Sequence, residues 1–97
     1  MDLDIIEELW QVIQDRKADP KSDSYTSSLI VDEERILEKL REELLEVEKA
    51  ARSGPLRSGR DSLVWEVSDL IYHLLVLLVA KGVELDDVLA ELRRRRR

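Results

Sequence analysis

Acidic side chains recur at helical spacing in two stretches of this chain. The first stretch carries Glu42, Glu43 and Glu46, and the second carries Glu66 and Asp69. Residues three or four positions apart lie on one face of an α-helix, so each stretch would present its carboxylates together. If the two faces pack against each other, the negative charges repel unless a cation lies between them. Oxygen ligands in a chain without cysteine suit Mg²⁺ or Mn²⁺ better than Zn²⁺.

A solvated acidic face is the alternative interpretation of the same spacing, because glutamate-rich helices commonly point their carboxylates into water. On a helical wheel, Glu43 lies at the edge of an apolar stripe, whereas Glu66 and Asp69 are embedded among valine, leucine and isoleucine. The spacing leaves both interpretations open. If the site is real, it indicates phosphate chemistry, since Mg²⁺ keeps several waters and binds substrate phosphates.

The single histidine, His73, falls within about 60° of Glu66 and Asp69 on the same wheel. A lone histidine on a buried helix is usually a hydrogen-bonded core residue. We therefore expect His73 to orient a carboxylate or a water and not to bind the metal itself.

Apolar spacing predicts four helices that would position these side chains, over about residues 2–16, 32–52, 61–82 and 85–94. Residues 21–28 are polar and read as a loop, and 53–55 should stop the second helix before a flexible connection to residue 60. Either Asp61 or Ser62 could cap the third helix, which is apolar around most of its circumference and should be central. The fourth should bury a face that comprises Leu85, Val88, Leu89 and Leu92.

Composition supports a single all-α domain over 1–97, with 43% apolar and 39% charged residues. The absence of cysteine excludes disulfides and thiolate sites, and fits a cytoplasmic protein. A net charge of −6 argues against nucleic-acid binding, and the arginines at 93–97 read as a solvated helix end. The longest apolar run, 74–80, is too short to span a membrane.

The motifs resemble those of the phosphoribosyl-ATP pyrophosphohydrolase family, in the all-α NTP pyrophosphatase (MazG-like) superfamily. The superfamily pattern E-E-x-x-E followed by E-x-x-D is matched by residues 42–46 and 66–69. The family's D-R-K-x-x-P and S-Y-T segments are similar to 15–20 and 24–26. Its E-A-A-D-L-L-Y-H-L-L-V-L-L helix and its closing G-x-x-L-x-D-V segment resemble 66–78 and 82–88.

The resemblance implies hydrolysis of phosphoribosyl-ATP to phosphoribosyl-AMP and pyrophosphate in histidine biosynthesis. It implies that Mg²⁺ is held by Glu43, Glu46, Glu66 and Asp69, with Glu42 as an outer-sphere base or a support for the ligands. The residues expected to contact the substrate are cations and hydroxyl groups: Arg16, Lys17, Ser24, Tyr25, Thr26, Lys39 and Arg52.

We expect a homodimer that completes the four-helix bundle, because residues 74–79 are more apolar than a small monomer can cover. A separate cyclohydrolase, the expected next enzyme, is a possible partner. Two other functions remain open: a related pyrophosphatase that acts on another (d)NTP, and a non-catalytic helical interaction module.

Overall fold

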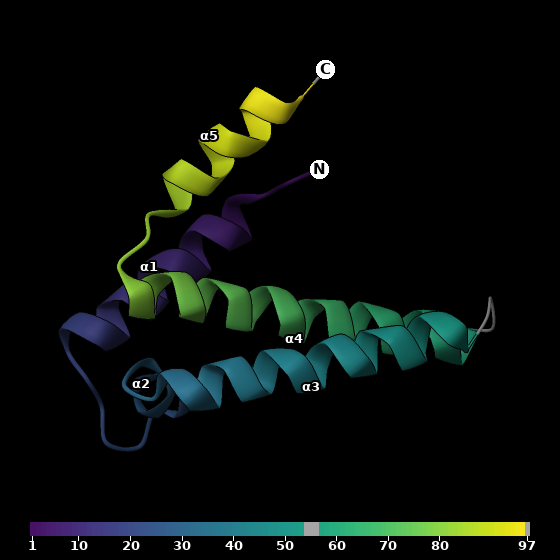
Figure 1. The fold of residues 1–97 in the computed structure, drawn as a ribbon, viewed down its shortest axis with the longest axis horizontal. Coiled ribbons are helices and arrows are strands. Elements are labelled where there is room, and N and C mark those ends of the chain that lie inside the picture. Colours follow the sequence, from purple (N-terminus) through teal and green to yellow (C-terminus); the bar gives the residue numbers. More distant parts are fainter. Residues whose placement is uncertain (54–56, 97) are drawn as a thin grey trace.

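The computed structural model describes residues 1–53 and 57–96, which are entirely helical apart from turns and connections (Figure 1). The all-α prediction is confirmed for the part of the chain that is described. The helices, in chain order, are α1 (Asp4–Ala18), α2 (Tyr25–Ile30), α3 (Glu33–Arg52), α4 (Arg57–Lys81) and α5 (Leu85–Arg95).

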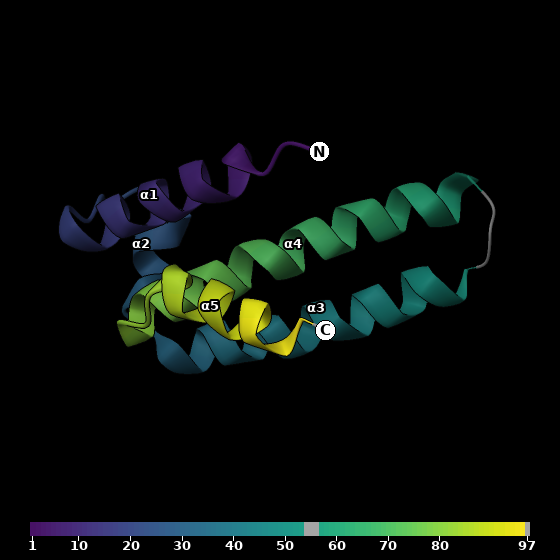
Figure 2. The same cartoon turned by 90° about the horizontal axis from the view of Figure 1, so that it is seen from above.

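Helices α3 and α4 form a long antiparallel pair and lie side by side in every view (Figures 1 and 2). The Asp32 side chain caps α3 by accepting a hydrogen bond from the Arg35 backbone N–H at 3.2 Å. The helix buries Ile36, Glu43 and Ala50 along one stripe. A buried stripe that contains a glutamate is the feature of the pair that bears on function.

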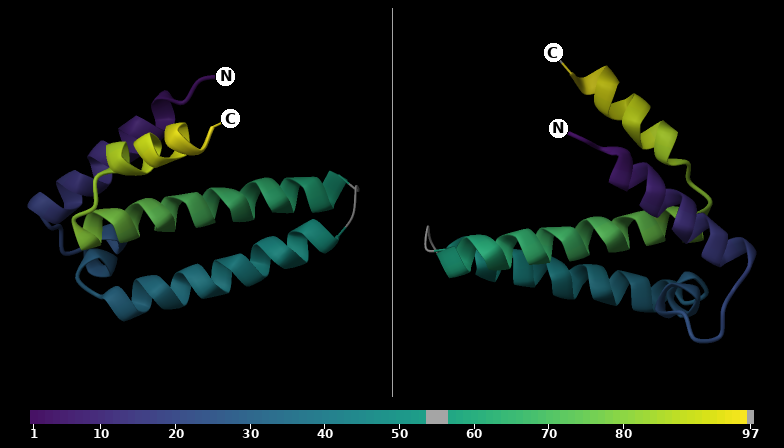
Figure 3. Two further views of the ribbon diagram at one scale, coloured as in Figure 1. Left: turned by 45° about the horizontal axis from the view of Figure 1, so that its top comes forward. Right: turned by 180° about the vertical axis from the view of Figure 1, so that it is seen from behind.

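The core lies at the end of this pair where α3 begins and α4 ends, and α1 and α2 pack there against α4 (Figure 3). Its fully buried side chains come from four different helices: Ile13, Leu29, Ile36 and Val76. Burial of a large aliphatic side chain contributes about 1.5–3 kcal/mol, so these residues hold the short α2 in place.

Two predicted boundaries are wrong. Residues 25–28, predicted as part of the polar loop over 21–28, belong to α2, because Ser24 caps that helix and Leu29 is buried in the core. The described residues therefore form five helices and not the predicted four. Helix α4 begins at Arg57, so neither Asp61 nor Ser62 is its cap. The predicted stop at Gly54 and Pro55 lies outside the described residues.

Helix α5 differs from its prediction because none of its residues is buried. Leu85, Val88 and Leu89 are half-buried, and Leu92 is exposed. The helix leaves α4 at Gly82, whose left-handed φ of +69° is typical of the residue that follows a helix end. It then runs away from the α3–α4 pair (Figure 1).

One side of α4 remains uncovered in the single chain. We call it the open face of α4, and it consists of Val64, Val67, Ile71 and Leu74, all exposed. These residues alternate at spacings of three and four, as in the seam of a coiled coil. The open face is therefore arranged as a surface for another helix.

The segment Ser62–Lys81 is also long and apolar enough for a membrane span, with a mean hydropathy of 1.8 and 22% of the window buried. The sequence argument considered only the longest uninterrupted apolar run, 74–80, and so did not detect this average over the whole segment. Length and composition alone are weak support for a span, because the central helix of a bundle has the same properties. This helix packs along α3 and carries Glu66, Asp69 and His73.

Candidate functional site

A buried contact between a carboxylate and an imidazole joins α3 to α4 at the centre of the predicted acidic region. The Oε1 atom of Glu43 lies 2.6 Å from Nδ1 of His73, and both residues are 6% exposed. The same Nδ1 lies 2.9 Å from the backbone carbonyl oxygen of Asp69, one turn earlier on α4. Nε2 of His73 lies 2.8 Å from the Tyr25 hydroxyl of α2. Three helices thus meet at one imidazole ring.

The second oxygen of Glu43 is the unusual feature of this site. Oε2 is buried and has no hydrogen-bond partner, whereas buried carboxylate oxygens are normally satisfied. Burial raises the pKa of Glu43; His73 acts in the opposite direction, and the Asp69 charge raises the pKa further. An unpartnered buried oxygen beside a second carboxylate fits a hard cation that binds oxygen.

The other predicted ligands lie nearby but do not converge. Glu66 and Asp69 are half-buried on α4, and Glu46 is exposed on α3, where its Oε1 pairs with Nζ of Lys49 at 3.2 Å. Within residues 1–53 and 57–96, no three acidic or histidine side chains gather closely enough to hold one ion.

Lys39 is the predicted cation that lies closest to this region. Its ammonium lies 3.6 Å from Oε2 of Glu42, and its charge lowers the pKa of both Glu43 and Tyr25, in each case against the larger effect of burial. Arg35 also lowers the pKa of Tyr25. Sequence reasoning missed Arg35, which precedes Lys39 by one helical turn and would have been found from that spacing.

The hydroxyl groups predicted to bind phosphate already have partners within the protein. Oγ of Ser24 accepts from the Ser27 backbone N–H at 3.1 Å, and Tyr25 contacts His73. The buried Thr26 hydroxyl forms a hydrogen bond with the hydroxyl of Tyr72. Sequence reasoning missed Tyr72, for which its position next to His73 is the only local signal. This segment therefore docks α2 onto α4.

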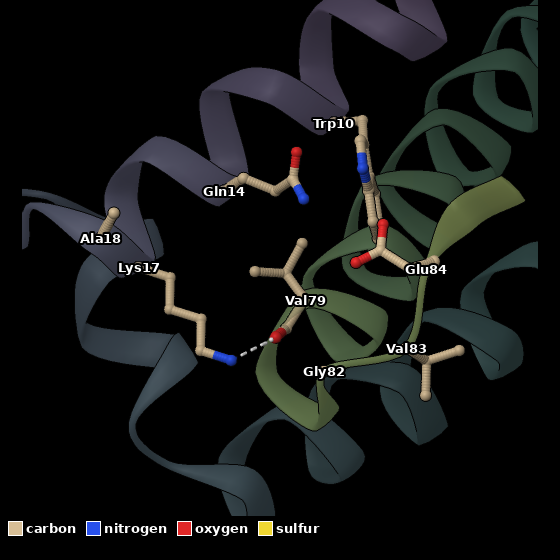
Figure 4. Close-up of a pocket in the computed structure, with 8 residues that line it drawn as sticks. All are labelled: Trp10, Gln14, Lys17, Ala18, Val79, Gly82, Val83 and Glu84. Atoms are coloured by element: carbon tan, nitrogen blue, oxygen red, sulfur yellow. Dashed lines mark hydrogen bonds between the residues drawn. The ribbon is translucent and has the colours of Figure 1, made fainter.

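The remaining predicted cations lie away from Glu43 or pair locally. Arg16 pairs with Asp15 at 2.9 Å, and Arg52 pairs with Glu48 at 2.9 Å. Nζ of Lys17 donates to the Val79 carbonyl oxygen at 2.9 Å, near the end of α4 (Figure 4). Val79 follows His73 by six residues, or about 9 Å along the helix. Lys17 therefore braces α1 against α4.

Figure 4 shows the cavity beside this brace, which has a volume of about 420 Å³. Trp10 and Gln14 line it from α1, and Glu84 lines it from the connection between α4 and α5. None of the five predicted acidic site residues contributes to its lining. The cavity is thus separate from the acidic region.

Comparison with known proteins agrees with the acidic motifs. The family described as phosphoribosyl-ATP pyrophosphohydrolase matches residues 6–96. A phosphoribosyl-ATP pyrophosphatase of Clostridium novyi is 45% identical over 96 residues, which cover 98% of this chain and 84% of that protein. One from Haloarcula marismortui is 46% identical and covers 96% of this chain and 94% of its own length.

A longer relative is also similar. The histidine biosynthesis bifunctional protein HisIE of Caldanaerobacter subterraneus is 43% identical over 94 residues. The match covers 96% of this chain but only 44% of that protein. The similar region is therefore one part of a larger bifunctional chain in that organism.

Proposed function

This chain belongs to the phosphoribosyl-ATP pyrophosphohydrolase family, and we propose that it hydrolyses phosphoribosyl-ATP to phosphoribosyl-AMP and pyrophosphate in histidine biosynthesis. The observation that carries the proposal is the match over nearly the whole chain to relatives of similar length that are named for this activity. A single all-α domain over 1–97 and a cytoplasmic location are consistent with that role.

The proposed cofactor is Mg²⁺, which Mn²⁺ could replace, held by Glu43, Glu46, Glu66 and Asp69. The unpartnered Oε2 of Glu43 and the nearby Asp69 charge support this set. Glu46 has only to leave Lys49, and exposed ion pairs of that kind contribute about 0–1 kcal/mol. When bound, the cation would neutralise phosphate charge and lower the pKa of a water ligand.

The protein's own groups would do the remaining work. Glu43 is held at one oxygen by His73, which leaves the other oxygen free as a ligand. Lys39 is proposed to bind the substrate phosphates, since its ammonium lies beside the acidic region and pairs with the exposed Glu42 at 3.6 Å. Glu42 is then the candidate acceptor for the proton that the attacking water loses as the bond between the α- and β-phosphates breaks.

A homodimer is part of the proposal. The open face of α4 has coiled-coil spacing, and residues of this kind are rarely left exposed as a contiguous patch in a soluble protein. A second copy of the chain would cover it with the same face, as twofold dimers do. The covered face lies on the helix that carries Glu66 and Asp69, so the dimer would also stiffen the site.

A functional link to a cyclohydrolase is also proposed. The bifunctional relative joins a region similar to this chain to a further segment within one protein. Covalent linkage in one organism favours cooperation between separate chains in another, whether or not they bind stably.

The decisive assay measures pyrophosphate release from phosphoribosyl-ATP with Mg²⁺, compared with dUTP, dCTP and ATP. The Glu66→Gln variant is the control, because it removes a proposed ligand charge with little change in size. We expect preference for phosphoribosyl-ATP and its loss in the variant. Preference for a simple NTP would assign the chain to a related pyrophosphatase, and no metal-dependent release from any substrate would leave the helical interaction module.

A further inference from the structure

A directed line of polar contacts runs from the surface of α2 to the buried carboxylate of α3. It begins at the Tyr25 hydroxyl, passes through Nε2 and Nδ1 of His73, and ends at Oε1 of Glu43. Tyr25 was expected to bind phosphate, but its hydroxyl points inward to the imidazole. Tyr25 as a whole residue is 45% exposed.

The partners of the ring determine where its proton lies. Nδ1 faces the Asp69 carbonyl oxygen at 2.9 Å and the Glu43 carboxylate at 2.6 Å, and both are acceptors. We assign the hydrogen to Nδ1 on this basis. In the neutral ring Nε2 then lacks a hydrogen and accepts one from the Tyr25 O–H. In this line the Tyr25 hydroxyl therefore donates to Nε2, and Nδ1–H donates to Glu43.

Packing holds the ring in the same orientation as the hydrogen bonds. Tyr25 and Tyr72 both meet His73 edge to face, with ring centroids 5.8 Å and 5.4 Å from it. Thr26, next to Tyr25 on α2, bonds to the Tyr72 hydroxyl. Helix α2 thus contacts two successive residues of α4, but only the Tyr25 contact leads on to Glu43.

We propose that Tyr25 is a positioning residue, whose hydroxyl donates to Nε2 and holds the orientation of His73 so that Glu43 presents its free oxygen to the cation. The inference rests on the proposed metal site and adds α2 to the machinery that shapes it. A residue that supports a metal ligand from behind typically changes metal affinity about 10–100-fold when it is altered. The Tyr25 ring would still border the site, but its hydroxyl would not contact phosphate.

The test compares Tyr25→Phe with Tyr72→Phe. Each variant removes one hydroxyl between α2 and α4 and keeps the aromatic ring, but only Tyr25 contacts His73 with its hydroxyl. Mn²⁺ affinity is measured without substrate, by electron paramagnetic resonance. We expect Tyr25→Phe to weaken Mn²⁺ binding about tenfold or more, and Tyr72→Phe to change it far less.

A second measurement follows the imidazole directly. His73 is the only histidine in the chain, so its ¹⁵N signals need no assignment. The wild-type protein should show the Nδ1–H tautomer. Tyr25→Phe should keep that tautomer but shift the Nε2 signal, because Nε2 loses its hydrogen bond, while circular dichroism stays unchanged. At saturating Mn²⁺, the KM for phosphoribosyl-ATP should be close to that of the wild type.

Several results would overturn the inference. Equal Mn²⁺ affinity in wild type and Tyr25→Phe would do so, particularly with a raised KM, which is the signature of direct phosphate contact. Equal losses in both variants would reduce Tyr25 to a docking residue for α2. If the wild-type protein binds no Mn²⁺, the metal site and this inference fall together, whereas Mn²⁺ binding without pyrophosphate release would remove only the proposed reaction.

Discussion

Glu43 combines a buried position with a carboxylate oxygen that has no partner, and both properties disfavour the charged form of the side chain. Burial raises the pKa of its carboxyl above the ordinary value of 4.5; the His73 contact partly offsets this rise and the Asp69 charge adds to it. An apolar residue would fill the position at less cost. The retained carboxylate is understandable if a cation completes it.

The raised pKa of Glu43 predicts how the metal-free protein responds to pH. A carboxyl with a raised pKa binds its proton more tightly in the folded state, so its contribution to stability is present at low pH. That contribution is lost as pH rises from the ordinary value through the raised one. Glu43→Gln should remove this loss and raise the free energy of unfolding near neutral pH by about 1–3 kcal/mol.

Thermal melting across pH, with and without Mg²⁺, checks this prediction. Mg²⁺ should raise the melting temperature of the wild type and leave Glu43→Gln unchanged. Glu42→Gln is the matched control, because the neighbouring Glu42 is exposed. Without metal, this variant should change neither the free energy of unfolding near neutral pH nor its dependence on pH. An unaltered pH slope in Glu43→Gln would contradict the burial argument.

Among the elements, α1 and α3 each carry a lysine that the sequence predicted to bind phosphate, but the fold gives the two lysines different positions. Lys17 of α1 donates to the last turn of α4, where a positive charge also complements the helix dipole. Lys39 of α3 lies beside Glu42 and the acidic region. Their spacing in the sequence does not distinguish them.

The pair Lys17→Met and Lys39→Met separates these positions. Lys17→Met should lower the free energy of unfolding by about 1–2 kcal/mol and leave the KM for phosphoribosyl-ATP unchanged, because only a brace between helices is lost. Lys39→Met should raise KM about tenfold, with little change in stability, through loss of a charged phosphate contact. Denaturant unfolding measures the stability effect, and steady-state kinetics measures KM. A raised KM in Lys17→Met together with lost stability in Lys39→Met would contradict the roles given to the two lysines.

At the scale of the whole molecule, the single chain leaves its central helix covered on one side only. Residues toward the α3 side and the core, such as Val76 and Leu75, are buried, whereas Ile71 and Leu74 are exposed. A monomer therefore leaves a row of apolar side chains of α4 exposed to solvent. We therefore propose that the dimer completes the fold as well as the site.

Ile71→Glu should convert the dimer to a monomer, because it places two like charges opposite each other in a twofold seam. Light scattering at assay concentration measures the change. Val31→Glu is the control, since Val31 is 81% exposed but lies at the end of α2, outside the open face. A wild-type protein that is monomeric at that concentration would refute the dimer.

By itself the sequence determined the helical class, the approximate extents of the long helices and the acidic motifs of α3 and α4. These features depend on periodicity and spacing within a few turns, and such spacing is local. It missed α2, because six residues with polar neighbours are stabilised mainly by Leu29 in the core. Only the tertiary structure decided that Tyr25 meets His73, that Lys17 meets Val79, and that Glu43 is buried while Glu46 is exposed. Each depends on where helices cross, and residues far apart in the chain determine that crossing together.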